Sequence, residues 1–321
     1  MNRILVLGAS GFLGRHLCEK AAQLRCRVTA PTRRRESAKH LWPLPWVDTI
    51  EADVHDEATL TQLLQRHSAV VNLIGILHGS ERDFRHAHVE LAQKLVRACR
   101  SAGVQRAVQI SALGAATDAP SHYQRSKAEA EDVLTSSGLD VTILRPSVMF
   151  GEGDQLLNMF AKLQGWLPVV PLAHADARFQ PVWVQDVAQA VVQLLGDAMT
   201  QGSALGTERA PVYEACGPDV VTLRQMVQLA GRLSERPRPV LALPPFLGRL
   251  QAWTMKLAPG EPLLSSDNLD SMQVDNVASG TLPDLHALGI TPSALKAIAP
   301  TYLHPRETGV LIARRRAAGR F

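Results

Sequence analysis

The first seventeen residues constrain the fold more than any other stretch of this chain. The apolar run 4–7 ends at Gly8, two more glycines follow at intervals of three, Gly11 and Gly14, and apolar residues then recur with helical spacing. Strand, glycine turn and helix in this order form a phosphate-binding corner. Gly8 permits a sharp exit from the strand, Gly11 lets N–H groups approach a pyrophosphate, and Gly14 lets the helix pack on the sheet. An ordinary glycine-rich turn is the alternative, but the position at the first strand of the chain favours dinucleotide binding.

The corner also predicts which residues contact the cofactor first. The positive end of the helix dipole faces the doubly negative ligand, so the turn and the first helical residues should lie against it. These predicted contacts are Gly8, Ser10, Gly11, Phe12, Leu13 and Gly14.

Strands alternate with helices through the first half of the chain. Strands are predicted at 27–32, 46–51, 69–75 and 106–111, and helices at 57–66 and 84–102. The run 69–75 is apolar almost throughout, as expected for a parallel strand covered on both faces. The alternation predicts a doubly wound parallel α/β sheet of the Rossmann type with right-handed crossovers.

Three arginines, Arg33 to Arg35, follow the second predicted strand directly. In NAD-binding folds an acidic residue about 20 positions beyond the glycines accepts the ribose 2′-OH. Arg33 lies nineteen residues past Gly14, and residues 27–35 contain no acid. A guanidinium there would pair with a 2′-phosphate through charge-assisted bonds, so Arg33 and Arg34 predict NADP(H) rather than NAD(H). A solvated basic loop is the alternative.

The ends of the third and fourth predicted strands supply further cofactor contacts. Asp53 and Val54 follow the third strand, where the carboxylate could accept from the adenine amino group or cap the next helix. Asp56 is the better helix cap, which leaves Asp53 for the base. At the end of the fourth strand the predicted contacts are Leu73, Ile74 and Gly75.

Tyr123 and Lys127 form the candidate catalytic pair. They are four residues apart, so on a helix they share one face, and an ammonium beside a phenol lowers the pKa of the tyrosine. The lysine could also hold the nicotinamide ribose. Coincidental spacing is the alternative, but the position just after the fifth strand of a dinucleotide-binding sheet disfavours it. Ser111, at the end of that strand, is the third candidate.

The glycine pattern together with Tyr123 and Lys127 resembles the extended and atypical short-chain dehydrogenase/reductase superfamily, which includes NAD-dependent epimerases and dehydratases. The segments 144–151, 180–188 and 213–218 agree with that superfamily. Within it, the segments 123–127, 146–160, 180–187, 263–269 and 274–276 are similar to the dehydrogenase-like accessory subunit of respiratory complex I and its bacterial relatives. The similarity covers nearly the whole chain.

The resemblance implies a role and adds contacts. It implies bound NADP(H), association with respiratory complex I or quinone-biosynthesis proteins, and nicotinamide-end contacts at Pro146 and Val148. One departure matters: active relatives carry Ser or Thr two positions after Ser111, where this chain has Leu113. Losing one donor that stabilises developing charge costs about 10²–10³ in rate. Two hypotheses therefore stand: an accessory or assembly protein with a structural or redox-sensing cofactor, and an NADPH-dependent reductase or epimerase-like enzyme for an apolar or quinone-related substrate.

The second half of the chain should form a smaller mixed lobe. We expect a cofactor core at 1–150, a substrate or partner lobe at 151–305 with segments returning to the core, and a basic tail at 306–321. Asp186 should cap a helix at 187–195. Residues 244–258 place an apolar stripe on one helical face, which is either core, a lid over an apolar ligand, or a membrane-surface element.

Composition excludes several classes of function. The net charge of +4 over 321 residues is too small to predict nucleic-acid binding. Four cysteines without C-x-x-C spacing and eleven histidines without ligand spacing predict no metal site and no disulfide framework. The first predicted strand begins two residues after Met1, so we expect no targeting peptide and a cytoplasmic location, with peripheral contact at the inner membrane face left open.

Overall fold

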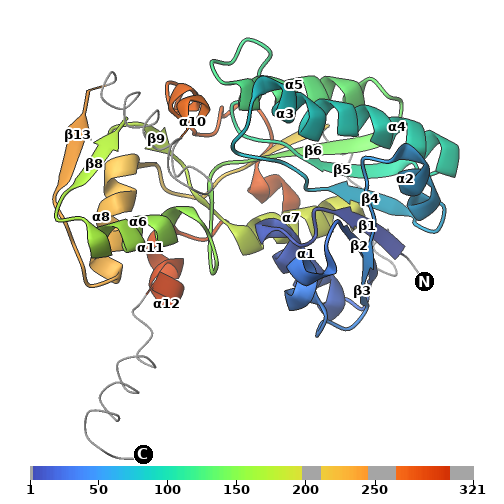
Figure 1. The fold of residues 1–321 in the computed structure, drawn as a ribbon, viewed down its shortest axis with the longest axis horizontal. Coiled ribbons are helices and arrows are strands. Elements are labelled where there is room, and N and C mark those ends of the chain that lie inside the picture. The colour runs from blue at the N-terminus through green and yellow to red at the C-terminus, as the bar shows by residue number, and fades with distance from the viewer. Residues whose placement is uncertain (1–2, 197–210, 245–264, 304–321) are drawn as a thin grey trace, which may run out of the picture.

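The computed structural model describes residues 3–196, 211–244 and 265–303. Its centre is a parallel seven-stranded sheet with strand order β11-β6-β5-β4-β1-β2-β3 (Figure 1). These strands are β1 (Arg3–Leu7), β2 (Arg27–Thr32), β3 (Val47–Glu51), β4 (Ala69–Asn72), β5 (Arg106–Ile110), β6 (Asp140–Pro146) and β11 (Val212–Ala215). The order reverses between β1 and β4, which is the switch point where doubly wound sheets bind dinucleotides. The predicted Rossmann fold is confirmed.

Helices cover both faces of this sheet, as the strand pattern requires. Along β1 the side chains alternate between two cores: Ile4 and Val6 face one, and Leu5 and Leu7 the other. The first core is covered by α1 (Phe12–Gln23), the 3₁₀ helix η1 (Arg35–Leu41) and α7 (Val184–Leu195). The second is covered by α2 (Glu57–Leu64), α4 (Leu91–Ala102) and α5 (His122–Thr135), on the opposite side in Figure 1.

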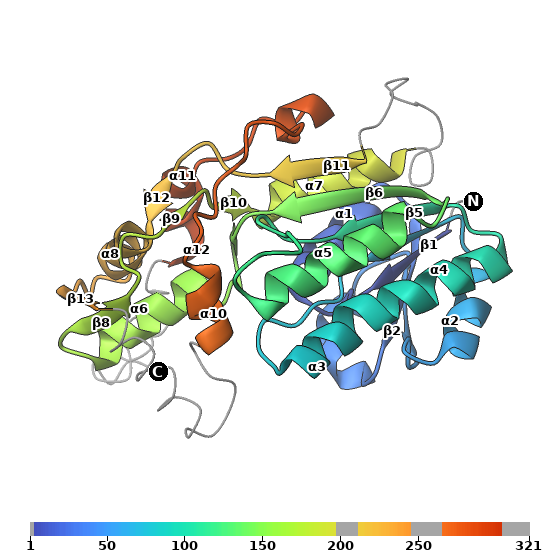
Figure 2. The same cartoon turned by 90° about the horizontal axis from the view of Figure 1, so that it is seen from above.

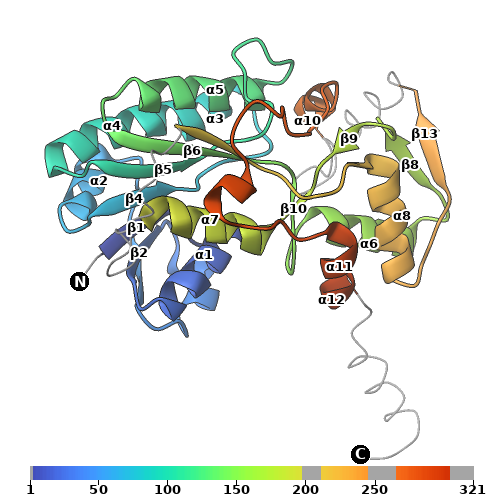
Figure 3. The ribbon, with the colours of Figure 1, turned by 180° about the vertical axis from the view of Figure 1, so that it is seen from behind.

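A smaller lobe lies beside the sheet and has a hydrophobic core of its own (Figure 3). Its helices are α6 (Leu156–Trp166), α8 (Leu223–Leu233), α11 (Leu295–Ile298) and α12 (Pro300–Leu303). Its short strands are β7 (Met149–Phe150), β8 (Val170–Ala173), β9 (Arg178–Phe179), β10 (Val182–Trp183), β12 (Val221–Thr222) and β13 (Val240–Leu243). They pair as β10-β7, β12-β9 and β13-β8.

Several segments after residue 150 return to the large sheet. Strand β11 extends it beside β6, and α7 packs against α1. The 3₁₀ helix η4 (Leu285–Leu288) joins the same core as α7, and α10 (Ser266–Ser271) lies near α5. Segments after residue 150 thus belong partly to the large sheet and partly to the smaller lobe, and the domain boundary near residue 150 stays a proposal.

The helical stretch predicted at 84–102 is present and ends at Gly103, but it consists of consecutive segments of different type: α3 (Glu81–Phe84), the π-helix η2 (Arg85–Glu90) and α4. Two other local predictions were wrong. The strand predicted to reach residue 75 ends at Asn72, since its side-chain oxygen accepts from the Ile74 N–H and turns the chain. Asp186 does not cap a helix: α7 already begins at Val184, and the carboxylate accepts from the Ser293 N–H at 2.7 Å.

Some predictions fall on residues outside the described ranges. The apolar stripe at 244–258 lies outside them except for its first residue, as does the basic tail at 306–321. Among the described helices, none is long and apolar enough to cross a membrane.

Candidate functional site

The predicted site residues gather at one edge of the large sheet. Parallel strands end together, so the residues that follow β1, β2, β3, β4, β5 and β6 meet at the carboxyl edge. Figure 2 shows this edge facing the smaller lobe, with the N-terminal end of α5 beside it. The sequence-predicted contacts therefore come from six different strands but lie on a single side of the sheet.

The glycine corner has the geometry that a dinucleotide requires. Gly8 has a φ of +80°, which favours glycine, and a Cβ at Gly14 would lie 2.5 Å from the Ala9 Cα and the Gly8 carbonyl oxygen. Gly11 is the N-cap of α1, and no side-chain cap hydrogen bond is formed there among the described residues. The first N–H groups of the helix therefore remain available to pyrophosphate oxygens, and the corner fits the cofactor.

Arg33 and Arg34 are exposed at the end of β2 and have no carboxylate partner in the described part of the chain. The nearby acid, Glu36, pairs with Lys39 instead. The loop backbone is nevertheless fixed, because the Thr32 and Ser37 hydroxyls both donate to the Arg34 carbonyl oxygen, at 3.1 and 2.6 Å. Two uncompensated guanidinium groups on a fixed loop suit an anionic group such as a 2′-phosphate.

The adenine side is built from the ends of β3 and β4. Asp56 caps α2, as predicted, by accepting from the Thr59 N–H at 2.9 Å. Asp53 stays exposed and uses Oδ1 to accept from the His55 N–H at 2.9 Å. Val54 is buried beneath this turn, and the half-buried Leu73 and Ile74 leave β4 toward the exposed Gly75. Their placement agrees with adenosine contacts, which stay a prediction.

Tyr123 and Lys127 share one face of α5, with the ammonium 6.0 Å from the centre of the phenol ring. Lys127 is buried and donates to the Ile110 carbonyl oxygen at 3.2 Å. A Cβ at Gly75 would lie 3.1 Å from Nζ, so glycine leaves room for the ammonium beside the predicted ribose position. Burial lowers the pKa of Lys127 to about 8, and Glu131 opposes that shift. Burial raises the pKa of Tyr123 to about 12, so the predicted lowering of the tyrosine pKa is wrong for the cofactor-free chain.

Ser111 and Leu113 determine which hydrogen-bond donors this edge of the sheet offers: Ser111 has a hydroxyl, and the Leu113 side chain has no donor. Ser111 Oγ is buried and has no hydrogen-bond partner within the described residues, which marks a place for a polar group of a ligand. Leu113 is 3% exposed, and only its backbone N–H is used, donating to the Pro146 carbonyl oxygen at 3.0 Å. Pro146 is the last residue of β6 and Val148 follows two residues later; their contact with the nicotinamide end stays a prediction.

His88 is a site residue that the sequence analysis missed. It is 3% exposed, and its ring lies 5.7 Å from the Tyr123 ring. Its Nε2 accepts from the Ile76 N–H at 3.2 Å, so Nδ1 carries the proton and donates to Ser126 Oγ at 2.8 Å. Ser126 Oγ in turn donates to the Tyr123 carbonyl oxygen. This chain of bonds joins the loop after β4 to the tyrosine turn of α5.

The signal for His88 is its spacing along the helical stretch. His88 lies four residues after Phe84 and three before Leu91, so helical spacing puts it on the buried face that these two residues share. It lies in the π-helix η2, a form found frequently at functional sites. Burial and the nearby Lys127 ammonium lower the pKa of His88 to about 2, so the imidazole is neutral at physiological pH.

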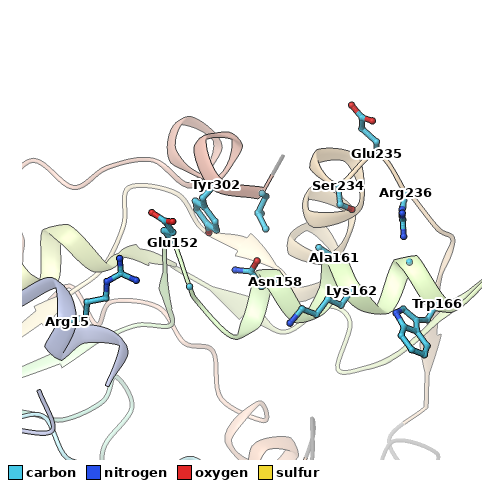
Figure 4. A pocket seen from close by; sticks show the side chains of 13 residues that line it. Arg15, Glu152, Asn158, Ala161, Lys162, Trp166, Ser234, Glu235, Arg236 and Tyr302 are labelled. Atoms are coloured by element: carbon cyan, nitrogen blue, oxygen red, sulfur yellow. The ribbon is translucent and has the colours of Figure 1, made fainter. Parts of the chain in front are cut away.

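The described residues contain no group of three or more His, Cys, Asp or Glu side chains that could hold a metal ion. A separate hollow of about 810 Å³ lies along α6, and Lys162 and Trp166 of that helix are among the residues that line it (Figure 4). Tyr123 is not among the lining residues. Arg236 approaches it from the end of α8, and Arg15 reaches it from α1. None of the predicted site residues lines this hollow.

Comparison with known proteins gives concordant results. The family model described as NAD(P)H-binding matches residues 8–198. Among curated proteins, the chain is 31% identical over 315 residues to the mitochondrial NADH dehydrogenase [ubiquinone] 1 alpha subcomplex subunit 9 of Arabidopsis thaliana, covering 93% of this chain and 76% of that protein. It is 28% identical over 193 residues to the ceramide reductase of Caulobacter vibrioides, 59% of each chain.

A solved structure with the same fold is the NADPH-dependent quinone oxidoreductase QOR2 of Escherichia coli, complexed with NADPH. The TM-score is 0.71 at 21% identity, over 94% of this chain and 99% of that one. At this level of identity the likeness concerns the fold.

Proposed function

Since this chain belongs to the NAD(P)H-binding family, and to the branch that contains subunit 9 of the complex I alpha subcomplex, we propose that it is an NADP(H)-binding accessory or assembly protein. The cofactor is held as a structural or redox-sensing group. The protein works with respiratory complex I or with proteins of quinone biosynthesis, in the cytoplasm and at the inner face of the membrane.

One observation carries the proposal: the site is complete for binding but incomplete for turnover. The glycine corner, the arginines without a carboxylate partner in the described part of the chain, and the Tyr123–Lys127 pair lie where a dinucleotide-binding site would use them. Where a hydroxyl donor would hold a substrate oxygen, the buried Leu113 presents only carbon. A site of this composition binds the nicotinamide end while lacking one group that stabilises developing charge.

The choice of NADP(H) over NAD(H) rests on Arg33 and Arg34. An NAD-type site would offer a carboxylate to the ribose 2′-OH at this place, and a 2′-phosphate would be repelled by it. The chain offers two guanidinium groups instead, and Glu36, two residues beyond Arg34, is engaged by Lys39.

Two experiments test this proposal. Mass spectrometry of the nucleotide that co-purifies with the protein should identify NADP(H). Affinity purification at native expression should recover respiratory or quinone-biosynthesis proteins. Recovery of NAD(H) would refute the cofactor assignment, and recovery of the free protein alone would count against the accessory role.

A second function is favoured by one specific observation, the buried Ser111 hydroxyl without a partner among the described residues. With Tyr123 and Lys127 in place, Ser111 could supply the donor that Leu113 lacks. The protein would then be an NADPH-dependent reductase or epimerase-like enzyme acting on an apolar or quinone-related substrate. The similarity to a ceramide reductase agrees with an apolar substrate.

The enzymatic alternative makes an opposite prediction for the cofactor. NADPH in the protein should be oxidised when a substrate from a panel of quinones, long-chain ketones and nucleotide sugars is added. Tyr123→Phe should abolish that oxidation while NADPH still binds. A panel that leaves NADPH unoxidised in the wild type would favour the accessory role.

A further inference from the structure

The first turn of α5, which carries Tyr123, is capped by a distant residue. Asp267 Oδ1 accepts from the His122 N–H at 2.7 Å, and Oδ2 accepts from the Tyr123 N–H at 3.1 Å. The next N–H, of Gln124, donates to Ser121 Oγ at 3.1 Å. The first three N–H groups of the helix are therefore all hydrogen-bonded. Two of them bond to a carboxylate, whose negative charge interacts favourably with the positive end of the helix dipole.

Asp267 is held firmly in this position. It lies on α10, whose start is fixed by reciprocal bonds: the Asn268 N–H donates to Ser265 Oγ, and the Ser265 N–H donates to Asn268 Oδ1, both at 3.1 Å. The Asp267 side chain is buried, at 7% exposure. Figures 1 and 2 show α10 between the smaller lobe and the N-terminal end of α5.

The chain around α10, residues 265–276, touches two more loops of the site; we call it the strap. Asn268 Nδ2 donates to the Leu77 carbonyl oxygen at 3.3 Å, in the loop after β4. Asn276 Oδ1 accepts from Ser147 Oγ at 2.6 Å and from the Val148 N–H at 3.1 Å, in the loop after β6. The strap therefore meets the loop after β4, the tyrosine turn and the loop after β6, which together surround the predicted nicotinamide end.

The strap is also tied to the smaller lobe. The Asn276 N–H donates to the Arg178 carbonyl oxygen at 2.8 Å, and the Gln180 N–H donates to the Asn276 carbonyl oxygen at 2.9 Å. A shift of the strands around Arg178 would move the strap and, through Asp267, the first turn of α5.

We propose that Asp267 is a positioning residue for Tyr123, through which the smaller lobe sets the affinity for the nicotinamide half of the cofactor. This inference rests on the proposed binding of NADP(H). Without the carboxylate, two N–H groups at a packed helix end lose their acceptors, and Tyr123 is the second residue of that helix. The adenosine half is predicted to bind at the far strands, after β2 and β3, whereas the hydrogen bonds of Asp267 go to α5.

The test compares a whole cofactor with its adenosine half. Dissociation constants for NADPH and for adenosine 2′,5′-bisphosphate are measured by calorimetry on the wild type, Asp267→Ala and Asp267→Asn. Asp267→Ala should weaken NADPH about tenfold, the loss expected for unpaired donors, and leave the bisphosphate unchanged. Asp267→Asn keeps the shape and one acceptor oxygen, so its NADPH dissociation constant should lie between those of the wild type and Asp267→Ala.

Ser266→Ala is the control on the same helix, because Ser266 is the exposed neighbour of Asp267 on α10. It should leave both constants unchanged. Equal weakening of both ligands by Asp267→Asn, or no loss of NADPH affinity in either Asp267 variant, would overturn the positioning role. A wild type that binds neither ligand would instead overturn the proposed function, and this role with it.

Discussion

Glu131 and Arg145 form a two-pronged ion pair one helical turn beyond Lys127. Arg145 Nε lies 2.9 Å from Glu131 Oε1, and its NH2 group lies 2.5 Å from Oε2. The carboxylate is buried, at 6% exposure. It also raises the pKa of Lys127, against the larger effect of burial. The Glu131 carboxylate therefore favours the charged lysine at the candidate site from the side away from Tyr123.

Glu131→Gln should destabilise the fold and lower the pKa of Lys127 below about 8. Removing the buried Glu131 carboxylate takes the main partner from the half-buried Arg145, so the free energy of unfolding should fall toward the loss of about 3–5 kcal/mol known for fully buried pairs. Urea denaturation measures this loss. Glu129→Gln on the same helix is the control, because its pair with Arg85 is exposed and should contribute little. Similar losses in the two variants would show that the buried pair has no special role.

Lys127→Met should change how stability depends on pH. The pKa of Lys127 falls from 10.5 to about 8 on folding, so between those values the unfolded chain binds a proton that the folded chain does not. The free energy of unfolding of the wild type therefore increases as pH rises from about 8 to 10.5, and it decreases again as pH falls toward 8. The free energy of unfolding of Lys127→Met minus that of the wild type should therefore be larger below pH 8 than near pH 10.5. Urea denaturation at both pH values measures the difference, and a constant difference would contradict the shift.

Arg33→Ala combined with Arg34→Ala should weaken NADPH far more than NADH. Each charge-assisted bond to a phosphate contributes about 1.5–3 kcal/mol, so the pair should cost at least about tenfold in NADPH affinity. Lys39→Ala is the control, because that cation is already paired with Glu36. Fluorescence titration of the wild type, the double variant and the control with both cofactors gives the dissociation constants. Equal losses for NADPH and NADH would show that the arginines form a solvated loop.

Gly14→Ala should abolish cofactor binding and destabilise the chain. The new Cβ would lie 2.5 Å from the Ala9 Cα and from two carbonyl oxygens, so strand and helix would have to separate. Overpacking of this kind costs about 1–3 kcal/mol. Gly103→Ala is the control: its φ of +75° adds a conformational cost of about 1–2 kcal/mol, but its Cβ meets nothing within 4 Å. Thermal unfolding and NADPH titration should separate them, since only Gly14→Ala should lose binding.

His88→Ala should reduce NADPH affinity through its bonds to the loop after β4 and to α5. The change leaves the Ile76 N–H without its acceptor and Ser126 without its donor, which costs about 1–3 kcal/mol per buried group. The imidazole C–H resonances of wild-type His88 should not move between pH 5 and pH 8, because its pKa is about 2. A titration of His88 in that range by NMR would contradict the assigned bonds.

Much of the fold could be predicted because its signals are local. The glycines at 8, 11 and 14 need only their own strand and helix to form the corner, and the carboxyl ends of parallel strands must meet at one edge. The Tyr123–Lys127 spacing lies within one helix, so the shared face was predictable as well. Identical reasoning failed at Asp186, where a partner 107 residues away took the carboxylate that a helix start would otherwise use.

The chain by itself determined the corner, the sheet and the residue types along its carboxyl edge, because those depend on backbone conformation and on the spacing of side chains within single elements. Only the tertiary structure decided what surrounds Tyr123. His88 bonds to Ile76 and Ser126, the strap brings Asp267 to the α5 N-terminus, and burial keeps the phenol protonated. These features depend on desolvation and on hydrogen bonds between residues far apart in the chain, and spacing along a sequence carries no information about either.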